Sequence, residues 1–145
     1  MPLVEENIKV LASPDVIYPI IKDVKKFPEF MANVNEVIIK EEADGWQISE
    51  WHNEVDGRKI SWVEKDEYEP ENYLIKFSLV EGDLKKYYGH WRLKRLEDNS
   101  TLVDFSIYFE FGIPMLAPLL HPLLARKLRE NMRQMLTALK QKVEQ

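Results

Sequence analysis

Between Val34 and Phe111 the sequence repeats one pattern, a segment rich in β-branched and aromatic residues followed by a turn signal. Asp-Gly pairs favour two-residue hairpins, and clusters of Gly, Pro, Asn and Ser mark other tight turns. The turn signals are Asp44-Gly45, Asp56-Gly57, Glu69-Pro70-Glu71-Asn72, Gly82-Asp83 and Asp98-Asn99-Ser100. Because turns this short join antiparallel neighbours, the sequence predicts six consecutive strands in an antiparallel meander.

Alternation of apolar and polar residues identifies the strand faces that we expect to be buried. In the last three strands these inner residues are Ile75, Phe77, Leu79, Trp91, Leu93, Val103, Phe105, Ile107 and Phe109. Trp51 has the opposite parity from Trp46 and Ile48, so either it lies on the outer face or a bulge changes the register. The sequence leaves both alternatives open, and it also leaves open which faces His52 and His90 occupy.

Helical patterns flank the meander. A first strand, VEENIKVLA, with Val4, Ile8 and Val10 as candidate buried residues, precedes a helix start at Ser13-Pro14-Asp15. Pro19 predicts that this helix is short or kinked, and a second short helical piece, FPEFMANV, follows. The end of the chain has apolar residues at helical spacing, namely Leu120, Leu124, Leu128, Met132, Met135, Leu139 and Val143. We expect this long helix to cover the apolar face of the sheet.

Composition limits the class of protein. The 145 residues predict a single domain over residues 1–145, and 45% hydrophobic with 31% charged residues is typical of a globular chain. The net charge of −5 argues against a nucleic-acid surface. There is no cysteine, which excludes disulfides, thiolate catalysis and Cys-ligated metals and fits a cytoplasmic location. The first ten residues have acids where a secretory leader would be basic, so we expect no leader.

The most apolar run, FGIPMLAPLLHPLLARKL at residues 111–128, is interrupted by Pro114, Pro118 and Pro122. It could be a membrane anchor, a piece of core or the wall of a site. The run falls short of the roughly 20 consecutive apolar residues that a membrane span requires. The sequence therefore favours core or wall and predicts no transmembrane segment.

The order of elements resembles the START-like (SRPBCC, Bet v 1-like) superfamily. DVKKFPEFM after the first helix, ISWVEKD in the fourth strand, VEGDLKKYYGHWRL across a hairpin and the proline-rich lead into the last helix carry this resemblance over essentially the whole chain. Within the superfamily the chain looks most like the polyketide cyclase/dehydrase branch, with the coenzyme Q-binding proteins as near relatives. The resemblance implies an α+β helix-grip fold: a bent antiparallel sheet of seven strands, two short helices after the first strand, and a long C-terminal helix over a hydrophobic cavity.

The resemblance also implies which residues line that cavity. Trp91 matches a cavity tryptophan of the branch, and Gly89 would leave room for a flat ligand to approach the sheet. Methionines on the last helix suit an adaptable roof, although the same apolar stripe could simply fill a core. The expected ligand-binding residues are Phe27, Phe30, Met31, Trp62, Phe77, Leu79, Trp91, Phe105, Leu124, Leu128 and Met132.

No recognised catalytic or metal-binding signature occurs in the sequence, so we expect no metal and no cofactor. The aromatase/cyclases that this chain resembles usually carry an arginine where it has Asp66. Glu64 is a candidate general base if burial raises its pKa, with Tyr87 or His90 as proton donor. The alternative is that Glu64 and Asp66 are solvated at the end of their strand and that His90 is a surface residue.

The sequence is consistent with three functions. The first is binding, alone or as part of transport, of a hydrophobic or aromatic molecule such as a polyketide, an isoprenoid quinone or a lipid. The alternative is a polyketide aromatase/cyclase-type enzyme that uses Glu64. In the third, the same groove takes an apolar protein segment or contacts a membrane transiently through Arg126, Lys127, Arg129 and Arg133. We expect a monomer or a weak homodimer, and no nucleic-acid partner.

Overall fold

The structure, a computed structural model, describes residues 3–55, 57–82, 84–110 and 117–145. Seven strands form one sheet in which every neighbouring pair is antiparallel, in the order β1-β7-β6-β5-β4-β3-β2. The strands are β1 (Leu3–Val10), β2 (Val34–Ala43), β3 (Trp46–Val55), β4 (Arg58–Glu69), β5 (Leu74–Gly82), β6 (Lys86–Arg95) and β7 (Thr101–Glu110). The predicted meander is confirmed, and β1 joins it by pairing with β7.

Two short helical segments follow β1: α1 (Pro14–Lys22), where it was expected, and η1 (Val24–Glu29), which begins before the expected segment FPEFMANV and covers only its first three residues. Ser13 is the N-cap of α1 and Pro14 opens it, although the Ser13 side chain makes no capping hydrogen bond. A further turn, η2 (Pro70–Asn72), joins β4 to β5. The expectation that this part of the chain carries only short helices is therefore confirmed.

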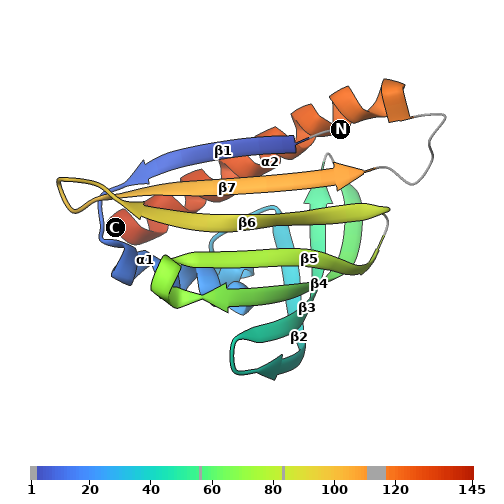
Figure 1. Ribbon diagram of the computed structural model, residues 1–145. Coiled ribbons are helices and arrows are strands. Elements are labelled where there is room, and N and C mark those ends of the chain that lie inside the picture. The colour runs from blue at the N-terminus through green and yellow to red at the C-terminus, as the bar shows by residue number, and fades with distance from the viewer. Residues whose placement is uncertain (1–2, 56, 83, 111–116) are drawn as a thin grey trace.

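The long helix α2 (Ala117–Glu144) packs along β1 and β7 (Figure 1). It begins before Pro122, which lies inside the helix, so this proline does not belong to the connection between β7 and α2. Pro114 and the side chains of Pro118 and Leu120 lie outside the described residues. No described helix combines the length and apolar character needed to cross a membrane.

Three irregularities bend the sheet. Bulges occur in β2 between Val34 and Glu36 and between Ile39 and Glu41, and the β4–β5 register shifts between Val63 and Glu64. A bulge adds a residue to one strand and increases its local twist. As a result, β2 and β3 run across the direction of β1 and β7, and the sheet wraps around the core (Figure 1).

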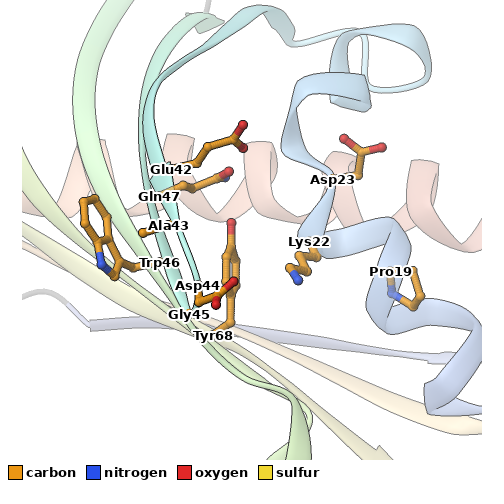
Figure 2. Close-up of a pocket in the computed structure, with 10 residues that line it drawn as sticks. All are labelled: Pro19, Lys22, Asp23, Glu42, Ala43, Asp44, Gly45, Trp46, Gln47 and Tyr68. Carbon is orange, nitrogen blue, oxygen red and sulfur yellow. The ribbon is translucent and has the colours of Figure 1, made fainter.

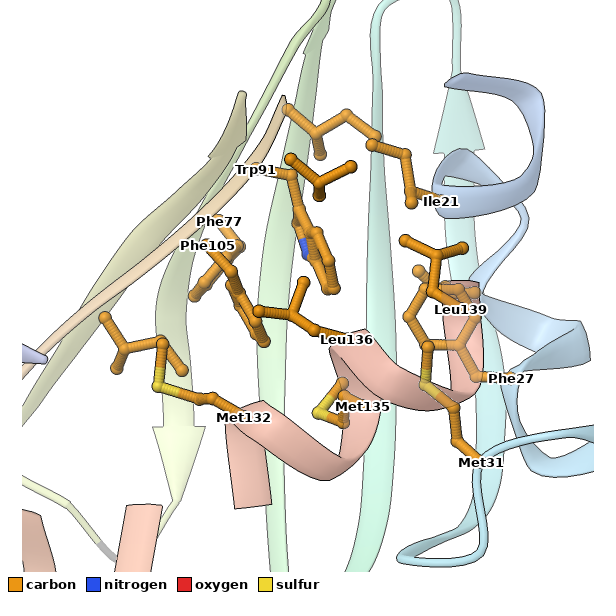
Figure 3. Packing of buried hydrophobic residues seen from close by; sticks show 14 of the residues in the cluster. Ile21, Phe27, Met31, Phe77, Trp91, Phe105, Met132, Met135, Leu136 and Leu139 are labelled. Carbon is orange, nitrogen blue, oxygen red and sulfur yellow. The ribbon is translucent and has the colours of Figure 1, made fainter. Parts of the chain in front are cut away.

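The core lies between the concave face of the sheet and the helices. Met132, Leu136 and Leu139 of α2 are at most 2% exposed. Leu136 lies against the rings of Trp91 and Phe105, and Leu139 lies beside Phe27 (Figure 3). The expected inner residues of β5, β6 and β7 are buried, with the exception of Leu79, which is only partly buried. Val4 and Val10 of β1 are buried as expected, whereas Ile8 is partly buried.

Trp51 lies on the inner face of β3 and is buried in the core. No bulge interrupts the β3–β4 register, in which Trp51 lies opposite Trp62. Trp46 and Ile48 therefore lie on the outer face, where the Lys65 ammonium sits 5.3 Å from the centre of the Trp46 ring. The inner residues of this strand are Gln47, Ser49, Trp51 and Asn53, all of them buried.

Candidate functional site

Seven aromatic rings form a closed series of contacts inside the molecule, which we call the aromatic circuit. Neighbouring ring centres lie 3.8–6.2 Å apart in the order Phe27, Trp51, Trp62, Tyr87, Phe77, Phe105, Trp91 and back to Phe27. Two pairs are stacked, Trp51 on Trp62 and Trp91 on Phe105. Period-two alternation places these side chains on one face of five strands, and η1 adds Phe27.

Five rings of the aromatic circuit are buried and two are partly buried. Trp62 and Tyr87 are only partly buried, and so are Leu124 and Leu128 in the first half of α2. Tyr87 lies opposite Phe109, close to the end of β7. The partly buried members of the circuit are therefore the two rings on β4 and at the start of β6.

Two carboxyl groups lie beside the circuit on the inner face of β4. Glu64 is 3% exposed and Asp66 is 2% exposed, so neither is solvated at the end of the strand. Asp66 Oδ2 accepts hydrogen bonds from Gln47 Nε2 (3.0 Å) and Ser49 Oγ (2.7 Å). Glu64 Oε1 accepts one from Trp62 Nε1 (2.7 Å). We call Glu64 and Asp66 the acid pair.

The protonation of the acid pair follows from its surroundings. Burial raises the pKa of Glu64 well above its ordinary value of 4.5, and the charge and hydrogen bond of Asp66 raise it further. Burial, together with the charges of Glu64 and Asp66, also raises the pKa of Tyr87 well above its usual value. Below this raised pKa, Glu64 therefore carries a proton and is the donor in its hydrogen bond with Asp66, and in this form it is an acid rather than a base.

The same network orients the stacked indoles. Trp62 Nε1 donates to Glu64, while Trp51 Nε1 donates to Ser49 Oγ (2.9 Å), which in turn donates to Asp66. The two ring planes differ by only 7°. Both indole N–H groups are thus anchored to the acid pair, and this fixes one wall of the aromatic circuit.

A cleft of about 370 Å³ lies on the other side of this network, between α1 and the β2–β3 hairpin (Figure 2). Gln47 and Tyr68 line it, and the ammonium of Lys22 lies 4.7 Å from the centre of the Tyr68 ring. Because Gln47 also donates to Asp66, one side chain separates the acid pair from this cleft.

The structure does not bring His90 to Glu64. Tyr87, Gly89 and Trp91 face inward on β6, so His90 faces outward, where it lies opposite Lys76 and lines a shallow groove of about 630 Å³. Burial, followed by the charge of Arg92, lowers the pKa of His90. Of the two candidate proton donors, only Tyr87 shares the interior with the acid pair.

Most of the expected ligand-binding residues do come together. Phe27, Met31, Phe77, Trp91, Phe105 and Met132 are buried in one cluster, and Phe30, Trp62, Leu124 and Leu128 pack against it. Leu79 is partly buried and is not a member of that cluster. Gly89 leaves no room for a ligand, because an added Cβ would lie 2.7 Å from Cζ of Phe77.

Sequence reasoning missed the polar inner face of β3. Gln47 and Ser49 complete the acid pair network, and Asn53 is buried further along the strand. One signal was available: a two-residue Asp56-Gly57 turn pairs Val55 with Arg58, and counting back from it places Trp51 opposite Trp62. The donors to the acid pair then follow from strand parity.

The charges on α2 are partly paired. Nε of Arg129 and Nε of Arg133 lie 3.7 and 3.0 Å from Oε1 of Glu6 on β1. Across the described residues, no group of three or more His, Asp or Glu side chains is placed to hold a metal ion.

Known structures share this architecture. TTHA0849 from Thermus thermophilus superposes with a TM-score of 0.90 at 27% identity, covering 98% of this chain and 97% of that one. The Zhui aromatase/cyclase from Streptomyces sp. R1128 gives a TM-score of 0.89 at 19% identity, covering 99% and 93%. The helix-grip fold expected from the sequence is thus confirmed.

A relative among characterised sequences is the ribosome association toxin RatA of Escherichia coli K12. It is 24% identical over 111 residues, which cover 77% of this chain and 70% of the relative. The family model described as polyketide cyclase / dehydrase and lipid transport matches residues 10–136. Because this match spans most of the sequence, the chain belongs to the polyketide cyclase/dehydrase and lipid transport family.

Proposed function

We propose that this protein binds an apolar or aromatic small molecule between α2 and the concave face of the sheet. The observation that carries the proposal is the aromatic circuit, in which five buried rings join the partly buried rings of Trp62 and Tyr87, while Leu124 and Leu128 of α2 also pack against the core. Small-molecule sites are mostly apolar and aromatic, with a few oriented polar groups. The description of the family, which includes lipid transport, supports the same class of ligand.

The driving force is burial of apolar surface. At about 25 cal/mol per Å², a ligand that removes on the order of 300 Å² of apolar surface from water gains about 7.5 kcal/mol, close to the scale of micromolar binding. Met132 and Met135 are buried in the same cluster as the rings of the circuit, and their unbranched side chains can move aside with little strain. We expect these methionines to shift when a ligand enters.

The test uses N-phenyl-1-naphthylamine, an uncharged dye whose fluorescence rises in apolar surroundings. Trp91→Ala removes a ring of the circuit, and Leu128→Arg places a charge where α2 packs against the core, so both variants should bind the dye more weakly. Leu123→Arg is the matched control, since Leu123 lies on the same helix and is 41% exposed. Circular dichroism should show folded protein in each case. Undiminished dye binding by both test variants would refute the proposal.

A second candidate, an aromatase/cyclase-type enzyme, is favoured by the raised pKa of Glu64 and the nearby Tyr87 hydroxyl. In this reaction the ionised Glu64 takes a proton from a carbon between two carbonyls of a poly-β-ketone. The resulting carbanion forms a carbon–carbon bond to another carbonyl carbon, and Tyr87 protonates the oxygen of that carbonyl.

The cyclase candidate makes a clear prediction about pH. Activity on an offered poly-β-ketone should rise with pH as Glu64 loses its proton, and Glu64→Gln should abolish it. A flat pH profile, or a fully active Glu64→Gln variant, would rule out this candidate while leaving the binding proposal intact.

The name of RatA refers to association with the ribosome, whereas the charges of this chain argue against an RNA-binding surface. An RNA-binding surface needs a basic stripe, and this chain has a net charge of −5. Two of the arginines on α2, Arg129 and Arg133, are paired with Glu6.

A further inference from the structure

Asn53 is a buried polar residue with one acceptor atom, Oδ1, that no described residue uses. Its side chain is 6% exposed, and among the described residues no group bonds to its Oδ1 atom. Buried polar atoms in folded proteins almost always have a partner, because leaving one without costs free energy. An unpaired acceptor in the interior is therefore a reason to look for a ligand that pairs with it.

The position of Asn53 links it to the aromatic circuit. It lies on the inner face of β3, two residues beyond Trp51, which belongs to the circuit. Its neighbours across the sheet are Ile60 on β4 and Val34 on β2. The first of the two β2 bulges lies directly beside Asn53, since Val34 pairs with Asn53 whereas Glu36 pairs with His52. Bulges of this kind are frequent next to binding and active sites.

Two further asparagines connect this part of β3 to α2. Asn33, in the loop after η1, accepts a hydrogen bond from the backbone N–H of Glu54 (3.0 Å). Its Nδ2 donates to the backbone oxygen of Asn131 on α2 (3.5 Å). The Asn131 side chain is itself buried, at 9% exposure. Asn53 thus lies near the place where β3, the loop after η1 and the middle of α2 meet.

The acid pair offers no comparable capacity. Glu64 receives the Trp62 N–H and donates to Asp66, while Asp66 also accepts from Gln47 and Ser49. Each carboxyl group of the acid pair thus already has hydrogen-bond partners. A ligand that bonded to Asn53 Oδ1 would displace no such partner.

We propose that Asn53 is a ligand-binding residue whose Oδ1 accepts a hydrogen bond from a hydroxyl or N–H group of a molecule lying on the aromatic circuit. The ligand class is an aromatic or other apolar compound that carries a hydrogen-bond donor at one end, such as a phenol. This inference rests on the proposed function and adds to it the polar group that the interior recognises.

The test compares 2-naphthol with 2-methoxynaphthalene by isothermal titration calorimetry. Both have the same ring system, but only the naphthol can donate a hydrogen bond. The wild-type protein should bind 2-naphthol about ten- to hundredfold more tightly, the range expected when a buried acceptor gains or lacks its partner. Asn53→Leu, similar in volume, should lose this preference while still binding 2-methoxynaphthalene. Asn7→Leu, at an exposed position on β1, is the matched control and should keep it.

The outcomes separate the inference from the proposed function. If the wild-type protein binds both compounds equally, or if Asn53→Leu keeps the preference, the inference is wrong and the binding proposal stands. If neither compound binds the wild-type protein, both are wrong. Should Asn53→Leu fail to fold, Asn53→Ser replaces it, because its shorter side chain cannot reach the same point. A preference lost in Glu64→Gln but kept in the Asn53 variants would assign recognition to the acid pair instead.

Discussion

Replacing Glu64 by glutamine should remove a pH-dependent weakness from the fold without disturbing the structure. Glutamine has the same shape as glutamate, so its side-chain oxygen can accept the Trp62 Nε1–H and its amide can donate to Asp66. Both bonds of the protonated Glu64 would survive. The variant loses only the group that titrates.

The magnitude follows from proton linkage. The pKa of Glu64 in the folded protein is raised well above 4.5, mainly by burial and by Asp66, whereas in the unfolded chain it takes its ordinary value. Between these two values the unfolded chain has released a proton that the folded protein still holds. The free energy of unfolding therefore falls as pH rises, by at most about 1.4 kcal/mol per pH unit for one proton. The contribution of protonated Glu64 to the free energy of unfolding is complete below about pH 4.5. It is lost once the pH passes the raised pKa of Glu64 in the folded protein.

Urea unfolding, followed by tryptophan fluorescence at half-unit steps above pH 5, measures this effect. The free energy of unfolding of the wild-type protein minus that of Glu64→Gln should decline steadily as pH rises. Glu67→Gln is the control, because Glu67 lies on the same strand but is exposed on the outer face. The free energies of unfolding of the wild-type protein and Glu64→Gln could instead change in parallel with pH across this range. In that case Glu64 does not retain its proton on folding, and our interpretation of the acid pair is wrong.

Three further substitutions test the packing by urea unfolding. Leu136→Ala should lower the free energy of unfolding by about 2–5 kcal/mol because Leu136 is 2% exposed, whereas Leu123→Ala on the exposed side of α2 should change it by less than about 1 kcal/mol. Similar losses in the two variants would contradict the placement of α2. Gly89→Ala should destabilise the protein by about 1–3 kcal/mol, since its Cβ would collide with the Ser106 carbonyl oxygen and crowd Phe77, and a neutral result would show that the sheet relaxes there. Tyr18→Phe should cost about 1 kcal/mol, because the Tyr18 hydroxyl donates a 2.8 Å hydrogen bond to the buried Leu74 carbonyl; an unchanged midpoint would mean that this bond contributes nothing net.

The strand order could be predicted because it depends on local signals. Gly45 and Gly57 adopt φ angles of +86° and +75°, and both follow an aspartate at a hairpin turn. Glycine takes up positive φ angles without the steric penalty that other residues incur, so the Asp-Gly pairs fix where β2, β3 and β4 reverse. Asn99 also lies in a turn and has a φ angle of +63°. Asparagine tolerates this left-handed conformation better than most residues other than glycine.

The inner face of β3 could not be predicted from alternation, because the first half of the strand has its apolar residues on the outer face. Trp46 and Ile48 suggest one face, but Gln47 and Ser49 are buried on the other. These polar residues are tolerated in the interior because they donate to Asp66 on the neighbouring strand. That compensation is a tertiary interaction, so single-strand patterning does not reveal it.

The roles of individual site residues were harder to predict than their burial. Glu64 and Tyr87 share the interior, whereas His90, one residue before Trp91, faces the outside because adjacent strand residues alternate. That Asn53 Oδ1 has no partner among the described residues is a property of the packed structure, and no local sequence signal predicts it.

The central claim is that the ligand lies between α2 and the sheet, and intermolecular nuclear Overhauser effects test it most directly. With N-phenyl-1-naphthylamine bound, we expect contacts from the dye protons to the methyl groups of Leu128 and Met132. Contacts to Leu3 and Val80, which are 53% and 55% exposed, with none to α2, would place the dye on the outside of the sheet and contradict the claim.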